Sequence, residues 1–192
     1  MEIKELFIKA NETEQSIIEQ IAGHQWELLM PEKVTRRPMT IMEVVRYHTW
    51  DSAWIPDGLA AKTIEEVGDT HDHLLKVRQE DLKSSFALYN QRAITAVRAL
   101  ENLDTIVHLT YGDFPARQFL QHNIGVRTFW AYDIARLIGV DFTLADDFVE
   151  ALIEEFSPVV ETYRQYGMFP PEVKAAADAS PQTKLLAMVG RD

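Results

Sequence analysis

Apolar residues recur every three or four positions along most of this chain, which is the spacing of helices that bury one face. The pattern predicts a first helix from about Ile3 to Ile21. A second helix is expected to begin at Thr40, because Thr40 and Glu43 have the spacing of a capping box. Pro56 should end or kink this second helix, since proline removes a backbone donor and crowds the preceding turn.

The pattern then predicts a third helix over 76–103, followed by a short extended piece within 105–112. A fourth helix comes next and has a clear start and stop. Pro115 suits its first turn, and Gly139 suits a left-handed cap at its end.

A fifth helix is predicted over 145–166, with a kink at Pro158. Ser180 as N-cap and Pro181 as the first helical residue begin one last short helix. The 192 residues are long enough to bury a core and correspond to a single domain, 1–192. We therefore expect an all-α fold, an up-down helix bundle with an extra short C-terminal helix.

Composition and charge narrow the range of functions. The formal net charge is −11, and no basic cluster stands out, which argues against nucleic acid and anionic membrane surfaces as partners. The chain has no long apolar run and no secretory signal pattern, so we expect a cytoplasmic protein. It contains no cysteine, so any metal must be held by histidine or carboxylate side chains.

The fourth helix carries the main candidates for a site. His122, Val126 and Trp130 are spaced i, i+4, i+8 and therefore share one face, with Asp133 about one turn further along. Bundles build their sites from side chains that converge from facing helices, so His122 and His48 of the second helix are expected to converge. The alternative for each histidine is simple packing in the core.

Other polar residues have simpler expected roles. Asp133 should hold a structural hydrogen bond within the bundle, because a buried carboxylate must find donors. Arg127 and Arg136 fall on other faces and are expected to be solvated or paired with the many acids of the chain. Arg191 is expected at the surface, with an anion-binding role at the pocket mouth as the alternative.

Three segments resemble signature segments of one protein family. Segment 40–62 resembles a W-x-V-x-x-L-x-x-H helix and reads TIMEVVRYHTWDSAWIPDGLAAK. Segment 129–152 resembles an H-x-W-D-L-A-R-A-x-G helix with the acidic helix that follows, and reads FWAYDIARLIGVDFTLADDFVEAL. Segment 163–192 resembles a closing R-x-x-G-x-F-G-P-x-V … L-L-A-x-x-G-R-D signature and reads YRQYGMFPPEVKAAADASPQTKLLAMVGRD. The family is the DinB/YfiT-like superfamily, in its mycothiol-dependent maleylpyruvate isomerase-like branch from actinobacteria, and the resemblance covers nearly the whole chain.

The resemblance implies a DinB-like four-helix bundle that holds a divalent metal, zinc or nickel. In the family the ligands are a histidine of the second helix and two residues one turn apart on the fourth. A low-molecular-weight thiol, mycothiol or bacillithiol, becomes the nucleophile when the metal lowers its pKa. The resemblance therefore implies a metal- and thiol-dependent isomerase or transferase.

The family's ligand positions carry over only in part. His48 matches the first ligand, and Asp133 matches the family's aspartate, which places the other two ligands at Val126 and Trp130. Neither of these side chains can bind a divalent cation. A tryptophan indole also fills much of the space that a metal and its substrate need.

Three explanations stay open. In the first, the metal site is lost and its cavity survives as an apolar pocket. In the second, the site has moved by one turn, so that His122 joins His48 with Asp51 or water completing the shell. In the third, the alignment of the family pattern is shifted. The bulk of Trp130 favours loss of the site over its relocation.

Two functions are therefore expected, each acting on a small molecule. One is the metal- and mycothiol-dependent isomerase or transferase, with His48 and His122 as metal ligands. The other is a metal-free protein that binds a small ligand or an interaction partner. The expected pocket residues are Val126, Trp130, Asp51 and Asp133. A homodimer is expected by analogy alone.

Overall fold

The computed structural model describes residues 1–35 and 37–192. The described chain is mainly helical, which confirms the expectation of a mainly α fold. Its α-helices are α1 (Ile3–Glu19), α2 (Glu32–Thr35), α3 (Ile41–Ala60), α4 (Gln79–Ala99), α5 (Ala116–Ile138), α6 (Asp146–Phe156), α7 (Val160–Gln165) and α8 (Pro181–Met188). The other described elements are two 3₁₀ turns, η1 (Ile64–Glu66) and η2 (Asp72–Lys76), and an antiparallel hairpin of β1 (Ile106–Leu109) and β2 (Gly112–Pro115).

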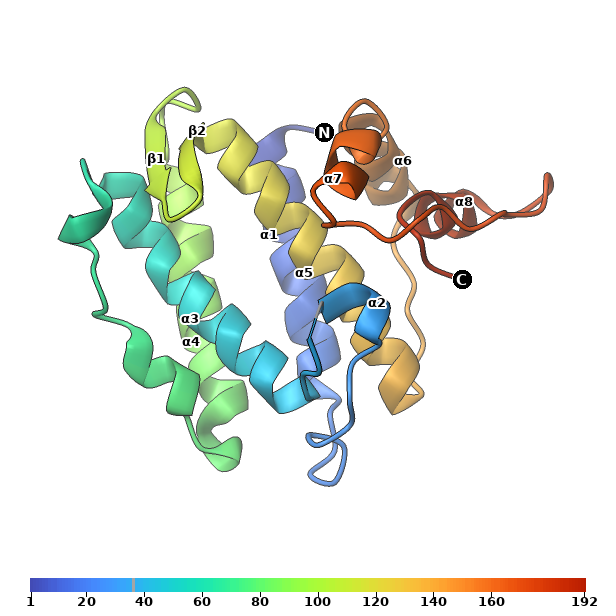
Figure 1. Cartoon of the computed structure of the whole chain (residues 1–192), viewed down its shortest axis with the longest axis horizontal. Coiled ribbons are helices and arrows are strands. Elements are labelled where there is room, and N and C mark those ends of the chain that lie inside the picture. Colours follow the sequence, from blue (N-terminus) through green and yellow to red (C-terminus); the bar gives the residue numbers. More distant parts are fainter. Residues whose placement is uncertain (36) are drawn as a thin grey trace.

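The four long helices α1, α3, α4 and α5 form the body of the molecule (Figure 1). The backbone of α1 packs closely against α5 and α4, and α3 packs closely against α4. The helices α3 and α5 lie further apart than these pairs, and long side chains span the space between them. The short helix α2 lies in front of the lower part of α5 in this view, and α6 packs against α8 beside α5 (Figure 1).

Several local signals in the sequence give the structures they predict. Thr40 and Glu43 form a capping box at the start of α3, in which each side chain accepts a hydrogen bond from the other's backbone N–H. Gly139 caps α5 in the left-handed region with φ of 74°. The hydroxyl of Ser180 accepts from the backbone of Thr183 at the start of α8.

Pro56 was expected to end or kink its helix, and α3 does not end there but continues through Pro56 to Ala60. Two other local predictions were wrong in detail. The extended piece pairs with residues 112–115 as a hairpin, so Pro115 belongs to β2 and is the N-cap of α5. The predicted fifth helix is two helices, because the chain leaves α6 after Phe156 and enters α7 only at Val160, on either side of Pro158.

The buried side chains form two apolar clusters separated by polar residues. One cluster surrounds Phe7, Phe129 and Phe156, and the other surrounds Ile18 and Phe86. Between them lie completely buried polar residues from all four long helices, which we call the polar layer: Asn11, Glu14, His48, Thr49, Ser52, Asn90, Arg127 and Thr128. On α1, α3 and α4 these residues follow one cluster and precede the other, so the layer crosses these helices about halfway along.

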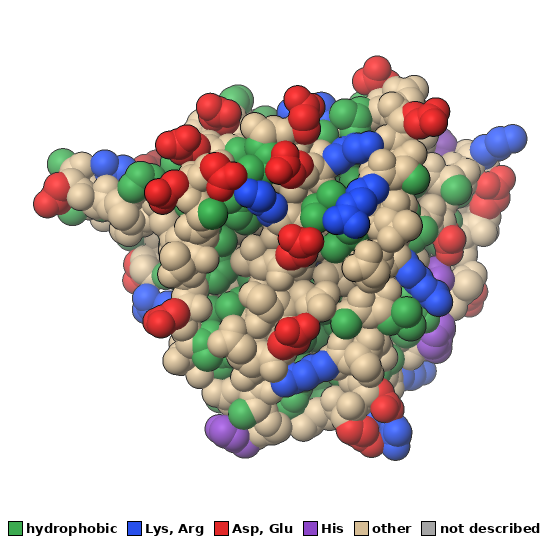
Figure 2. Space-filling model, turned by 180° about the vertical axis from the view of Figure 1, so that it is seen from behind, with side chains coloured by type: hydrophobic (Ala, Val, Ile, Leu, Met, Phe, Trp, Pro, Cys, Tyr) green, Lys and Arg blue, Asp and Glu red, His purple; other side chains and the backbone are tan. Residues whose placement is uncertain are grey.

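The exposed face opposite to that of Figure 1 is strongly charged. Figure 2 shows acidic and basic side chains interspersed over this face, with hydrophobic side chains between them. No described helix is both long enough and apolar enough to cross a membrane.

Candidate functional site

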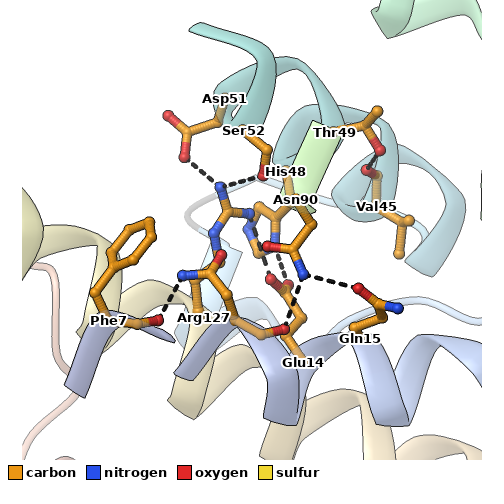
Figure 3. A network of polar contacts seen from close by, with 11 residues as sticks. Phe7, Glu14, Gln15, Val45, His48, Thr49, Asp51, Ser52, Asn90 and Arg127 are labelled. Atoms are coloured by element: carbon orange, nitrogen blue, oxygen red, sulfur yellow. Dashed lines mark hydrogen bonds and ion pairs between the residues drawn. The ribbon is translucent and has the colours of Figure 1, made fainter. Parts of the chain in front are cut away.

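Glu14 of α1 lies at the centre of the polar layer and contacts two other helices (Figure 3). Its Oε1 accepts a hydrogen bond from Nδ1 of His48 on α3. Its Oε2 lies 3.4 Å from Nη1 of Arg127 on α5. All three side chains are completely buried. Buried charges are tolerated only when they are paired, so these contacts decide how the three helices fit together.

Arg127 carries the contact from α1 across to α3. Its Nη2 donates to Oδ2 of Asp51 at 2.6 Å and to Oγ of Ser52 at 3.1 Å. Asp51 is the more exposed partner, with a quarter of its side chain accessible. One guanidinium therefore pairs with two carboxylates that come from different helices (Figure 3).

The contact with Glu14 also fixes the orientation of the His48 imidazole. A carboxylate only accepts, so the shared proton lies on Nδ1 of His48 and the opposite nitrogen, Nε2, points away from Glu14. This Nε2 has no hydrogen-bond partner among the described residues, and neither does Nε of Arg127. The Trp130 ring packs against the imidazole, with 5.1 Å between the ring centroids.

Asn90 connects α4 to the layer. The amide of Asn90 on α4 donates to the backbone carbonyl of Asn11 at 3.2 Å and to the Gln15 side chain at 3.0 Å. The amide of Asn11 donates to the carbonyl of Phe7 at 2.8 Å. The layer is thus a network with members from α1, α3, α4 and α5 (Figure 3).

A cavity of about 320 Å³, which we call the α5 pocket, is lined in part by Trp130. The helix α5 contributes four of its lining residues, His122, Gly125, Val126 and Trp130. The remaining lining residues are Val34, Thr35, Arg37, Met39, Tyr47, Tyr163, Met168, Phe169 and Arg191. Because of this composition the wall is mostly apolar and aromatic, with a few polar groups, as is usual for small-molecule sites.

Gly125 allows aromatic side chains to approach α5 closely. A Cβ atom at this position would lie 3.2 Å from the ring of Phe156 and 3.5 Å from that of Phe169. A larger residue would displace these rings, one of which lines the α5 pocket.

His122 lies at the aromatic end of the α5 pocket. The rings of Phe114 and Tyr163 meet its imidazole edge-on, with centroids 5.3 and 5.6 Å away. Burial lowers the pKa of His122 below its ordinary value, because a charged imidazole would lose its hydration. His122 is therefore neutral at pH 7 and can offer one donor and one acceptor nitrogen.

The hydroxyl of Tyr163 is already engaged. It donates to Oε1 of Gln121 at 2.8 Å. Burial, together with the nearby carboxylate of Glu155, raises the pKa of Tyr163 well above its usual range. Tyr163 thus presents its ring, and not an anionic oxygen, to the pocket.

Asp133 and Arg191 form a buried ion pair beside the α5 pocket. Oδ2 of Asp133 accepts from Nε of Arg191 at 3.0 Å and from Nη2 at 2.7 Å. Burial raises the pKa of Asp133, while the charge and hydrogen bonds of Arg191 act in the opposite direction. The predicted structural hydrogen bond of Asp133 is confirmed, but the predicted surface position of Arg191 is wrong, since only 2% of it is exposed.

The sequence-predicted site residues therefore fall into two places. His122, Val126 and Trp130 line the α5 pocket, whereas His48 belongs to the polar layer, with the Trp130 ring against it. The pocket lining does not include Asp51 and Asp133, which form ion pairs with arginines instead.

The residues present do not fit a divalent metal. Among the described residues, no group of three or more His, Asp or Glu side chains could hold an ion. Nδ1 of His48 is engaged by Glu14, and aromatic rings surround His122. Val126 and Trp130, which lie at the ligand positions implied by the resemblance, have no suitable donor atom. No metal-dependent step can be derived from this arrangement.

Glu14 and Arg127 were missed by the sequence reasoning. Arg127 was expected to be solvated or paired with acids. Solvation is wrong, because Arg127 is completely buried, whereas pairing is confirmed, with carboxylate partners from two other helices. A signal did exist in the first helix. Asn11 and Glu14 continue the buried face begun by Phe7, at helical spacing, although both are polar.

Comparison with protein-family models, with curated proteins and with solved structures gave no match.

Proposed function

We propose that this chain is a metal-free DinB-like bundle of the maleylpyruvate isomerase-like branch, and that it binds a small, mostly apolar molecule in the α5 pocket. The resemblance of three long segments to that branch supports the family assignment.

The α5 pocket is the observation that carries the binding function. Its volume of about 320 Å³ falls at the lower end of the range of small-molecule sites. It is roughly twice the size of engineered cavities that take up one benzene molecule. Val126 and Trp130, which replace the metal ligands implied by the resemblance, line it with apolar surface. The pocket therefore suits a ligand of one or two rings.

The polar groups of the pocket narrow the ligand further. The charge of Arg191 is neutralised by Asp133, and the hydroxyl of Tyr163 is engaged by Gln121. His122 is neutral and can exchange one hydrogen bond with a ligand. We therefore propose a ligand with an aromatic or cyclic body and one uncharged hydrogen-bonding group.

A titration followed by NMR tests this function. The probes are p-cresol, indole and cyclohexanol, added to the wild type and to Val126→Trp, in which the indole fills the pocket. Leu88→Trp is the matched control, because Leu88 is exposed on α4 and the same bulk is added there. We expect saturable binding by the wild type and Leu88→Trp, and its loss in Val126→Trp. Equal binding by all three proteins, or no saturable binding of any probe, would refute the proposal.

A metal- and thiol-dependent isomerase or transferase is the second candidate. The buried Nε2 of His48, which has no partner among the described residues, is a potential ligand atom in its favour. Metal analysis of protein purified without a histidine tag separates the two candidates. Stoichiometric zinc or nickel that disappears in a His48→Ala/His122→Ala variant would favour the enzyme, and metal-free protein favours the binding function.

A further inference from the structure

The charged residues in the wall of the α5 pocket are arginines. Among the described lining residues are Arg37 and Arg191, and none of them is an aspartate or a glutamate. The whole chain has 19 basic and 30 acidic residues, so a wall with two cations and no carboxylate differs from the chain as a whole. A local excess of positive charge attracts anions.

The two arginines differ in what they can offer a ligand. Arg191 is buried, and its charge is paired with Asp133. Arg37 is exposed and forms no ion pair with a described carboxylate. A guanidinium stays protonated in proteins and presents five N–H donors in one plane. Arg37 is therefore the residue of the wall that can bind an additional negative charge.

Buried neighbours on both sides hold the backbone of Arg37 at the pocket. Its carbonyl accepts a hydrogen bond from the hydroxyl of Thr35 at 2.7 Å, and Thr35 is buried. Two residues after Arg37, the carbonyl of Met39 accepts from the backbone N–H of Met30 at 2.9 Å, and both methionines are buried. Thr35 and Met39 also line the pocket. The guanidinium thus extends from a fixed part of the wall.

Arg37 and His122 lie toward opposite ends of the pocket. His122 is near the start of α5 and contacts Phe114 of the hairpin. Trp130 lies about 12 Å further along the helix axis and packs against the apolar cluster that contains Met39. The helix α2, which precedes Arg37, lies in front of the lower part of α5 (Figure 1). A ligand that reaches both residues needs polar groups at opposite ends of its apolar body.

We propose that the α5 pocket binds an aromatic acid, with the ring in the cavity, an uncharged polar group at His122 and the carboxylate at the guanidinium of Arg37. This inference rests on the proposed function and adds one negative charge to its ligand. A carboxylate suits arginine because two N–H groups can donate to its two oxygens. The net charge of −11 disfavours anions at long range, so a preference for the acid must come from a cation close to the ligand.

The experiment compares three probes by NMR titration at pH 7. p-Cresol tests the cavity alone, whereas 4-hydroxyphenylacetate and 4-hydroxyphenylacetamide have nearly the same shape and differ in charge. We expect the wild type to bind the acid about three- to fivefold more tightly than the amide, since an exposed ion pair contributes modestly. Arg37→Gln should bind the acid no more tightly than the amide, and its affinity for p-cresol should equal that of the wild type.

Arg98→Gln is the matched control. Arg98 is exposed on α4 and does not line the pocket, so this variant loses the same charge elsewhere and should keep the preference for the acid. Raising sodium chloride from about 0.05 M to about 0.5 M should reduce the preference in the wild type, because salt screens exposed charges. The affinity for the amide should not fall with it.

The possible results separate this inference from the proposed function. If p-cresol binds but the acid has no advantage over the amide, or if the advantage survives in Arg37→Gln, the inference is wrong and the proposed function stands. Binding of p-cresol without either larger probe also overturns the inference, because the opening would then not admit a carboxylate. If no probe binds, the proposed function is refuted and the inference fails with it.

Discussion

Replacing Glu14 by alanine is the most direct perturbation of the polar layer. The change removes the acceptor of His48 Nδ1 and the carboxylate that lies 3.4 Å from Arg127 Nη1. Both partners are completely buried, so neither can turn to water for compensation. Arg127 keeps Asp51 and Ser52 as acceptors, whereas Nδ1 of His48 loses the acceptor that fixes it.

The expected loss of stability follows from these contacts. Removing one member of a buried ion pair costs about 3–5 kcal/mol, because the other charge stays buried. The remaining bonds of Arg127 place the loss in the lower part of that range, about 3–4 kcal/mol. Domains of this kind have unfolding free energies of about 5–15 kcal/mol, so the change is a large fraction of the total. For a chain of this size it lowers the thermal midpoint by about 6–16 °C.

Urea denaturation followed by far-UV circular dichroism measures the effect, with Glu12→Ala as the control. Glu12 is exposed on the same helix, so its replacement should change stability by less than about 0.5 kcal/mol. The slope of the unfolding free energy with urea should stay the same in both variants. If Glu14→Ala loses less than about 1 kcal/mol, the charges of the layer are not held as buried pairs and the reasoning fails.

Three further predictions concern the α5 pocket and its surroundings. Burial lowers the pKa of His122, so the unfolded chain takes up a proton at a higher pH than the folded chain does. The free energy of unfolding should therefore fall as the pH drops below 6.5. In urea titrations, His122→Gln should reduce this dependence of stability on pH between pH 7 and pH 5. Burial raises the pKa of Asp133 above the value of 3.8 that it has in the unfolded chain. The contribution of Asp133 to stability is therefore present below pH 3.8 and is lost as the pH rises through the pKa of the folded protein. Asp133→Asn should lack that decline, although it is less stable overall, and an equally steep decline in both proteins would contradict the assignment. Gly125→Val should cost about 1–3 kcal/mol, because it displaces the rings of Phe156 and Phe169, and it should weaken probe binding in the NMR titration.

The parts of the fold that were predictable depend on short-range signals. Thr40 and Glu43 act through one turn of backbone, and Gly139 acts through its own φ angle, so the sequence around each is sufficient. The hairpin was missed because most of its second strand, 113–115, was assigned to the following helix. Strand pairing depends on a partner segment, which periodicity within one strand does not reveal.

The candidate site was predictable along a helix but not between helices. The i, i+4, i+8 spacing placed His122, Val126 and Trp130 on one face, and all three line the α5 pocket. Arg127 could not be placed in the same way, because its carboxylate partners are distant in sequence and lie on α1 and α3. Helical spacing predicts which residues of one helix lie on the same face. The pairing of charges in the polar layer depends on side chains from several helices, so helical spacing does not predict it.

The polar layer also has a consequence for how the helices are aligned. Apolar side chains above and below it would tolerate a slide of α1 past α5, since apolar contacts are not directional. A slide of one turn, about 5.4 Å, would separate Glu14 from Arg127 and place each of them against apolar neighbours. Replacing Glu14, His48 and Arg127 together by leucine or methionine should therefore give a bundle of similar stability with several helix alignments. Multiple sets of amide signals in its NMR spectrum would reveal them, and one sharp set would show that the apolar clusters fix the alignment alone.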